Sequence, residues 1–269
     1  MTPFELAEPR TLREAIALLD PEDTAVRPFG GGTALMLMMK AGVLRPSRLV
    51  GLHKIDGLAE IKEGPAGELR IGAMARLSDI ERSPVVKRGW PVIAKTLGGH
   101  LAHGDPHMDL PPVLSALGAR ATIAGPGGER SVPVESLYTG YLETSIERNE
   151  LITGIEVPPL AGRQAAYMKC TTRSADDWPA LGVAAVLKLK KNVIEEARIV
   201  ISAATDRPTR LLAAEKILAG KNPDERTLKQ AGEAAAAEVK IESDMHGSAA
   251  YKKHLLGVYL GRAIHEACR

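Results

Sequence analysis

The chain has 269 residues, of which 45% are hydrophobic and 25% are charged, the ordinary proportions of a folded globular protein. Its 35 Lys and Arg nearly balance its 33 Asp and Glu, so the net charge is +2 and no basic surface for nucleic acid is expected. The sequence holds neither an apolar run long enough to cross a bilayer nor the basic and apolar regions of a signal peptide. We therefore expect a cytoplasmic protein with no membrane span.

Cysteine usage limits the redox chemistry that the chain can carry by itself. Cys170 and Cys268 are the only cysteines, which fits a reducing compartment and leaves no disulfide framework. An ordinary iron–sulfur cluster needs more thiolate ligands than these two residues supply. Any such cluster that serves this protein must lie on another polypeptide.

The first part of the chain is expected to alternate short helices and strands. Thr11 and Glu14 have the spacing of a capping box, and Gly42 and Gly118 stand where helices end. The expected elements are helix 11–19, strand 25–29, helix 34–41, strand 48–52, a hairpin of 58–62 and 68–73, a short helix capped by Ser78, helix 110–117 capped by Asp109, a hairpin of 120–124 and 130–134, and strand 150–157.

The diproline Pro158-Pro159 is the best candidate for a domain boundary. It divides the chain into 1–159, with subdomains of about 1–55 and 56–159, and 160–269. The second part is expected to form a three-stranded antiparallel sheet and three helices. These elements are strands 165–169, 181–190 and 193–203, and helices 210–219, 225–239 and 248–268. Helices packed on one face of a sheet predict an α+β fold.

Two glycine-rich loops, at 29–33 and 96–100, each lead toward a helix start. Free backbone N–H groups at such places bind phosphate, because the donors are unpaired and the helix dipole favours an anion. One glycine triplet alone is more often a turn, but two loops followed by helices favour a ligand with a diphosphate. Neither loop matches the Rossmann fingerprint or the G-K-[ST] ending of a nucleotide triphosphatase loop.

Several stretches of the sequence, taken in order, resemble those of a known family. Residues 27–35, Arg-Pro-Phe-Gly-Gly-Gly-Thr-Ala-Leu, are similar to the first flavin loop in the medium subunits of molybdenum hydroxylases, the family of carbon monoxide dehydrogenase, xanthine dehydrogenase and aldehyde oxidase. Further landmarks follow in order at 71–77, 96–111 and 150–158, and the C-terminal part looks like that family's flavoprotein C-terminal domain. The resemblance thus covers essentially the whole chain.

The resemblance implies an oxidoreductase subunit that carries FAD in a PCMH-type, or vanillyl-alcohol-oxidase-like, flavin fold. It also implies a large subunit with molybdopterin and a small subunit with [2Fe–2S] clusters, assembled as a dimer of heterotrimers. Electrons would pass from those clusters through FAD to an external acceptor, and no side chain of this chain need be catalytic. Organic substrate and acceptor are not readable, because the substrate pocket would lie on another chain.

The resemblance also assigns cofactor-binding residues. The first cradle for the diphosphate would be Gly30, Gly31, Gly32, Thr33 and Ala34, and the second Thr96, Gly98 and Gly99. The further expected flavin contacts are His100, His103, Asp105, Asp109, Lys169, Asp177 and Trp178. His100 stands where family members often carry Asn, and it can still donate one hydrogen bond.

Several of these residues have a plainer structural interpretation. Asp109 would cap its helix, accept a ribityl hydroxyl, or do both. Asp105 before Pro106 favours a turn. Lys169 would either place positive charge near the pyrimidine end of the flavin or be a solvated strand charge, and Trp178 would either lie against the flavin ring or pack in the core.

Two other functions stay open on the sequence alone. His100, His103 and His107 lie close together with two aspartates, which would suit a metal-dependent hydrolase, although their spacing is not that of a usual metal site. The interval from Pro91 to Thr96 is short for the helix that the family places there, which would suit a scaffold subunit without flavin. Bound flavin would indicate the flavin subunit, bound metal the hydrolase, and neither of them the scaffold subunit.

Overall fold

The computed structural model describes residues 2–96, 101–171, 174 and 177–269. The helices are α1 (Leu12–Leu18), α2 (Thr33–Lys40), α3 (Leu77–Arg82), α4 (Pro84–Gly89), α5 (Pro91–Lys95), α6 (Leu110–Leu117), α7 (Leu212–Leu218), α8 (Glu225–Glu238) and α9 (Ala249–Ala267), with short 3-10 turns η1 (Leu101–His103) and η2 (Val134–Ser136). The strands are β1 (Glu5–Ala7), β2 (Val26–Phe29), β3 (Arg48–Gly51), β4 (Ile61–Glu63), β5 (Leu69–Gly72), β6 (Arg120–Gly125), β7 (Gly128–Pro133), β8 (Tyr138–Gly140), β9 (Glu143–Thr144), β10 (Leu151–Val157), β11 (Arg163–Cys170), β12 (Leu181–Lys190), β13 (Val193–Ser202) and β14 (Thr209–Arg210). Within the described ranges no helix combines the length and the apolar character that a membrane span requires.

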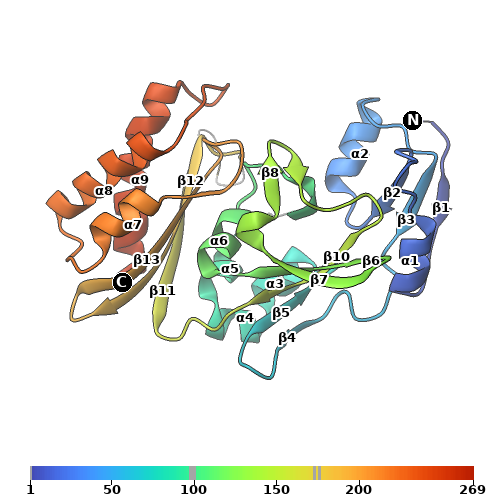
Figure 1. The fold of residues 1–269 in the computed structure, drawn as a ribbon, viewed down its shortest axis with the longest axis horizontal. Coiled ribbons are helices and arrows are strands. Elements are labelled where there is room, and N and C mark those ends of the chain that lie inside the picture. Colours follow the sequence, from blue (N-terminus) through green and yellow to red (C-terminus); the bar gives the residue numbers. More distant parts are fainter. Residues whose placement is uncertain (1, 97–100, 172–173, 175–176) are drawn as a thin grey trace.

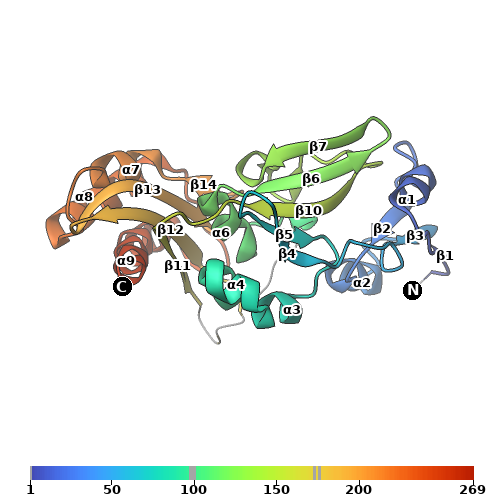
Figure 2. The same ribbon diagram turned by 90° about the horizontal axis from the view of Figure 1, so that it is seen from below.

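The three larger sheets follow one another along the long axis of an elongated molecule (Figures 1 and 2). The N-terminal sheet has the order β1-β3-β2 and is parallel. Helix α1 lies between β1 and β2 in the chain and starts at the expected cap: Thr11 accepts from the Glu14 N–H at 3.2 Å, and the Glu14 carboxylate accepts from the N–H of Arg10, one residue before the cap, at 2.9 Å. Strand β1 was not expected, because its short, mostly exposed sequence carries no alternating pattern.

The middle sheet has the order β4-β5-β10-β6-β7 and contains both expected hairpins. Helices α3, α4 and α5 lie beside it (Figure 2). The expected cap at Ser78 is wrong, because Ser78 lies inside α3 and the capping position is Arg76. Ser83 instead caps the next helix, where its hydroxyl accepts from the Val86 N–H.

The C-terminal sheet has four strands rather than the expected three, in the order β11-β12-β13-β14. Arg210 was expected in a helix, but it pairs with Val200 in β14, and its guanidinium binds Glu215 of α7. The other strands and the three helices lie close to their expected positions, and α7, α8 and α9 cover one face of this sheet (Figure 1). The expected mixed fold of helices and sheets is confirmed.

Helix α6 joins the middle sheet to the C-terminal sheet. All eight of its residues are buried, because it packs in one hydrophobic cluster with β5, β6 and β10 on one side and β12 and β13 on the other. Alternate residues of β12 therefore enter two cores: Ala184 and Val186 face α6, whereas Val183 and Leu187 face α7–α9. This arrangement brings the N-terminal end of α6 beside β11.

Candidate functional site

The first glycine loop connects β2 to α2 with its backbone open to an anion. Gly32 is the N-terminal capping residue of α2 and has φ +77°, where a Cβ would lie 2.5 Å from the Phe29 ring. No described side chain caps α2, so its first N–H groups remain for an outside acceptor. A Cβ on Gly31 would meet no atom within 4 Å, so the approach to these donors is clear. The geometry fits a phosphate group.

The other residues of the first cradle follow directly. Thr33 begins α2 and is exposed, whereas Ala34 is half-buried in the same first turn. A phosphate at this helix start would thus lie within reach of the Thr33 hydroxyl.

Only part of the second loop belongs to the described residues. Gly98, Gly99 and His100 lie outside them. Thr96 is buried, and its hydroxyl donates to the Val92 carbonyl at 2.7 Å. The short interval that precedes it forms the single-turn helix α5.

Asp109 stands at the capping position of α6 but does not act as a side-chain cap for that helix. Its carboxylate binds two side chains of β11: the Tyr167 hydroxyl donates to Oδ1 at 2.8 Å, and the Lys169 ammonium donates to Oδ2 at 2.8 Å. The capping interpretation is therefore wrong. Lys169 is likewise no solvated strand charge, because its side chain is only 16% exposed.

The Asp109 cluster is tightly packed. Burial, reinforced by the Asp109 charge, raises the pKa of Tyr167 well above its ordinary value, so its hydroxyl stays a donor. Gly182 of the neighbouring strand makes room for that hydroxyl, since a Cβ there would lie 2.5 Å from it. The cluster holds one cation and one anion in fixed positions at the edge of the C-terminal sheet.

Asp105 and His107 form a turn, as the Asp-Pro sequence predicts. One oxygen of Asp105, Oδ1, accepts from the His107 N–H at 2.9 Å and lies 3.1 Å from its ring Nδ1. Burial alone would raise the pKa of Asp105, but the bonds from His107 and the nearby charges of His107 and His103 outweigh it and lower that pKa. Asp105 is therefore a buried carboxylate that orients the His107 ring.

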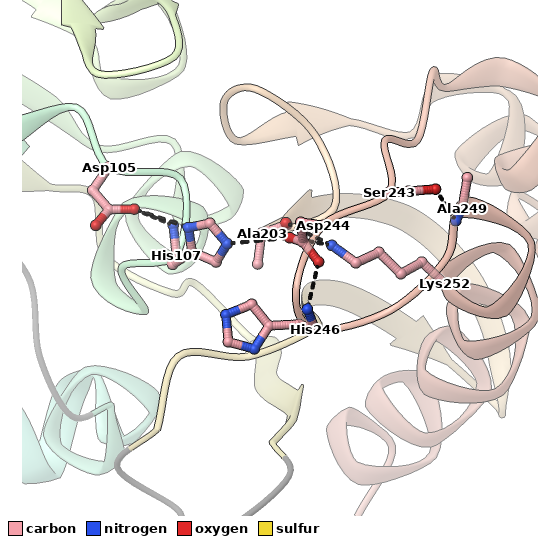
Figure 3. A network of polar contacts seen from close by, with 8 residues as sticks. All are labelled: Asp105, His107, Ala203, Ser243, Asp244, His246, Ala249 and Lys252. Atoms are coloured by element: carbon pink, nitrogen blue, oxygen red, sulfur yellow. Dashed lines mark hydrogen bonds and ion pairs between the residues drawn. The ribbon is translucent and has the colours of Figure 1, made fainter.

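On the opposite side, His107 faces the segment before α9 (Figure 3). Its Nε2 lies 3.7 Å from Oδ2 of Asp244, and the fully buried Lys252 donates to the same oxygen at 2.6 Å. The Asp244 carboxylate also lies next to His246, whose N–H donates to its Oδ1 at 2.8 Å. Asp244, His246 and Lys252 were not expected near this site, because no motif or spacing in the sequence connects them to the glycine loops.

Trp178 does not pack in the core. Its side chain is 50% exposed, and its indole stacks on the His107 ring with centroids 5.0 Å apart and an interplanar angle of 13°. The Asp177 carboxylate accepts from the Ser174 N–H at 3.2 Å. An exposed aromatic face suits a planar ligand.

The expected metal site included His100, which lies outside the described residues. Among the described residues, no three His, Cys, Asp or Glu side chains converge as metal ligands. His107 is instead held by Asp105 and stacked on Trp178. The hydrolase alternative is left without a ligand set among these residues.

The donor chemistry fits FAD: an open helix start for a diphosphate, a buried carboxylate and a held cation for a polar flavin edge, and an exposed indole for its ring. Comparison with known families agrees. Residues 2–160 match the FAD binding domain in molybdopterin dehydrogenase, and residues 165–267 match the CO dehydrogenase flavoprotein C-terminal domain.

Individual relatives match along nearly their whole length. The glyceraldehyde dehydrogenase medium chain of Sulfolobus acidocaldarius is 30% identical, over 98% of each chain. The carbon monoxide dehydrogenase medium chain of Hydrogenophaga pseudoflava is 31% identical, over 98% of this chain and 96% of that one. A solved carbon monoxide dehydrogenase from Hydrogenophaga pseudoflava superposes with a TM-score of 0.93, covering 99% of this chain and 98% of that one. The chain therefore belongs to the molybdenum hydroxylase family of oxidoreductases, as an FAD-binding subunit.

Proposed function

We propose that this chain is the electron-transfer subunit of a molybdenum hydroxylase complex, with FAD as its cofactor. A large subunit with molybdopterin would oxidise the substrate, and a small subunit with [2Fe–2S] clusters would pass the electrons on. The count of two cysteines supports clusters on another chain. A dimer of such heterotrimers in the cytoplasm is part of the same proposal.

The proposal includes a PCMH-type flavin fold over residues 1–159, with subdomains of about 1–55 and 56–159, and a C-terminal domain over 160–269. The N-terminal sheet, with the first glycine loop, and the middle sheet agree with this division. The shared hydrophobic cluster around α6 would hold the C-terminal domain in place over the cofactor.

Within this frame the first glycine loop, Gly30, Gly31, Gly32, Thr33 and Ala34, would hold the diphosphate. Thr96, Gly98, Gly99, His100 and His103 would complete the second side. When bound, FAD supplies the redox chemistry, accepting electrons singly or in pairs. The protein then has to bind, orient and tune it. The open start of α2 is the observation that supports this most strongly.

Asp109 and Lys169 would tune the flavin. Lys169 brings a cation to its polar end, and a cation there favours the reduced anionic form. Asp109 holds the ammonium at 2.8 Å and offsets part of its charge. The pair would thus moderate the potential and keep the lysine from turning toward solvent.

The test is an anaerobic reductive titration of the complex purified with its co-expressed partner subunits. We expect one FAD per chain, and we expect both the cluster and the flavin absorbance to bleach as reductant is added. Lys169→Met should lower the flavin midpoint potential, whereas the exposed Lys240→Met should not change it. A complex without flavin, or flavin that stays oxidised while the clusters are reduced, would contradict the proposal.

A further inference from the structure

His107 belongs to no sequence motif, yet its side chain is largely buried among charged and aromatic side chains. Its side chain is 9% exposed, with Asp105 at one ring nitrogen and Asp244 on the side of the other. The Trp178 indole covers one face in a near-parallel stack. The His246 ring lies 5.7 Å away at an angle of 50°. Nδ1 contacts the Asp105 carboxylate, whereas Nε2 is buried, lies 3.7 Å from the Asp244 carboxylate and makes no hydrogen bond within the described residues.

The two carboxylates are themselves fixed. Asp105 is 3% exposed and belongs to the turn that follows the second glycine loop. Asp244 belongs to a different part of the fold and is held by the buried ammonium of Lys252 (Figure 3). A backbone bond from the Ala203 N–H to the Pro106 carbonyl, at 2.9 Å, ties the same turn to the end of β13. The ring of His107 is thus bonded on one side by Asp105 and lies on the other side against the segment that carries Asp244.

Within the described residues, the ring contact recorded for Trp178 is its stack on His107. Half of its side chain is exposed, and the His107 ring is the aromatic surface against which it lies. An exposed indole without such a platform would sample several rotamers, since a surface side chain gains entropy by moving.

We propose that His107 is a positioning residue of the flavin site: its buried imidazole, held at Nδ1 by Asp105, is the platform that sets the orientation of Trp178 toward the flavin ring. Asp244 lies beside the opposite edge of the ring. The inference rests on the proposed function in so far as Trp178 contacts the flavin, whereas the stacking of Trp178 on His107 involves residues of this chain only. His107 thus has a role separate from any contact of its own with FAD.

The platform can be measured without cofactor. Trp90, the other tryptophan, is 3% exposed and donates to the Pro158 carbonyl, so a collisional quencher such as acrylamide reports on Trp178. His107→Ala should increase quenching of the tryptophan emission and shift its maximum to longer wavelength. His107→Phe, which restores a stacking ring, should return both toward the wild-type values. His265→Ala, at the far end of α9, should change neither.

A second measurement does not depend on how well a His107 variant folds. Trp178→Ala changes a half-exposed residue, so the chain should fold as the wild type does. In the wild type the indole ring current should shift the imidazole protons of His107 upfield, because the rings are stacked 5.0 Å apart, and Trp178→Ala should remove that shift. Imidazole resonances that stay in place would overturn the proposal, as would unchanged quenching in folded His107→Ala.

The effect on the cofactor is measured on the purified complex. His107→Ala should weaken FAD by about two- to tenfold, the loss of one aromatic pair, and should move the flavin potential and flavin fluorescence in the direction that Trp178→Ala does. His107→Phe should restore them. A His107→Ala complex with wild-type potential and fluorescence would contradict the positioning role, because a loss of stability alone would not reproduce the pattern of Trp178→Ala.

These results separate the two proposals. If the wild-type complex contains no flavin, the proposed function fails, while quenching and ring-current shifts still test the platform. If flavin is present and Trp178 is free in solution, the proposed function stands and the platform fails.

Discussion

Lys169 donates to Asp109 at 2.8 Å and thereby joins β11 to the start of α6, across 60 residues of sequence. The same carboxylate accepts from Tyr167. One aspartate thus connects the C-terminal sheet with the helix that it shares with the middle sheet, at the place where the polar end of the flavin is proposed.

Removing that aspartate should destabilise the protein. Asp109→Ala leaves a mostly buried ammonium without its counter-charge and a buried hydroxyl without its acceptor, which should cost about 3 kcal/mol. Urea unfolding measures the loss. In the double variant with Lys169→Met the cost should be smaller than the sum of the single costs, because the unpaired charge is gone. Additive costs would show that the two side chains do not interact.

The glycine loop allows ligand contact and backbone strain to be tested separately. Gly32→Ala should destabilise the protein by about 1–2 kcal/mol, because φ is +77° and the methyl group would meet the Phe29 ring. Gly31→Val, where the structure leaves open space, should abolish FAD retention but leave the unfolding midpoint of the apoprotein nearly equal to that of wild-type apoprotein. Thermal melts and the flavin released on denaturation measure the two effects. Stoichiometric FAD in folded Gly31→Val would reject the loop assignment.

Ala203 offers a stabilising change. It has φ +63°, a conformation that costs a residue with a Cβ about 1–2 kcal/mol, and both its N–H and its carbonyl are engaged by the turn and by Lys252. Ala203→Gly should raise the free energy of unfolding by about 0.5–1 kcal/mol after the larger chain entropy of glycine is deducted. The neighbouring Ala204→Gly, where φ is not positive, should lower it. Equal losses at both positions would mean that the backbone is not strained.

Asp105 should make the stability depend on acid pH. Its pKa is lowered in the folded state, so the folded protein binds a proton there less readily than the unfolded chain does. The stabilisation is therefore complete above about pH 4, the ordinary value for Asp, and disappears as the pH falls through the lowered value. Asp105→Asn should be less stable than wild type near neutral pH and approach it in acid. A difference that is constant with pH would contradict this assignment.

Local signals in the sequence were sufficient for most elements. Thr11 and Glu14 cap α1, and the glycine-containing turns between β4 and β5 and between β6 and β7 form hairpins. Lys191 and Asn192, both at positive φ, form the turn between β12 and β13. These features depend on neighbours within a few residues, so pattern and turn chemistry reveal them.

What the sequence did not reveal depends on distant partners. Strand β1 exists because β3 pairs with it, and β14 because β13 does. Asp109 has the position of a helix cap, yet two side chains from β11 take its carboxylate. The contacts of His107 with Trp178 and Asp244 come from segments that only the folded chain brings together. Family resemblance thus supplied a proposed set of site residues, but it could not supply the bonds among them.

Binding of the FAD diphosphate by the backbone at the start of α2 is tested by amide hydrogen exchange of the complex, with and without FAD. We expect slower exchange at Gly31, Gly32, Thr33 and Ala34 when FAD is present, with residues 64–67 of the β4–β5 turn unchanged. Equal exchange at the four amides in both states, with FAD bound, would contradict it.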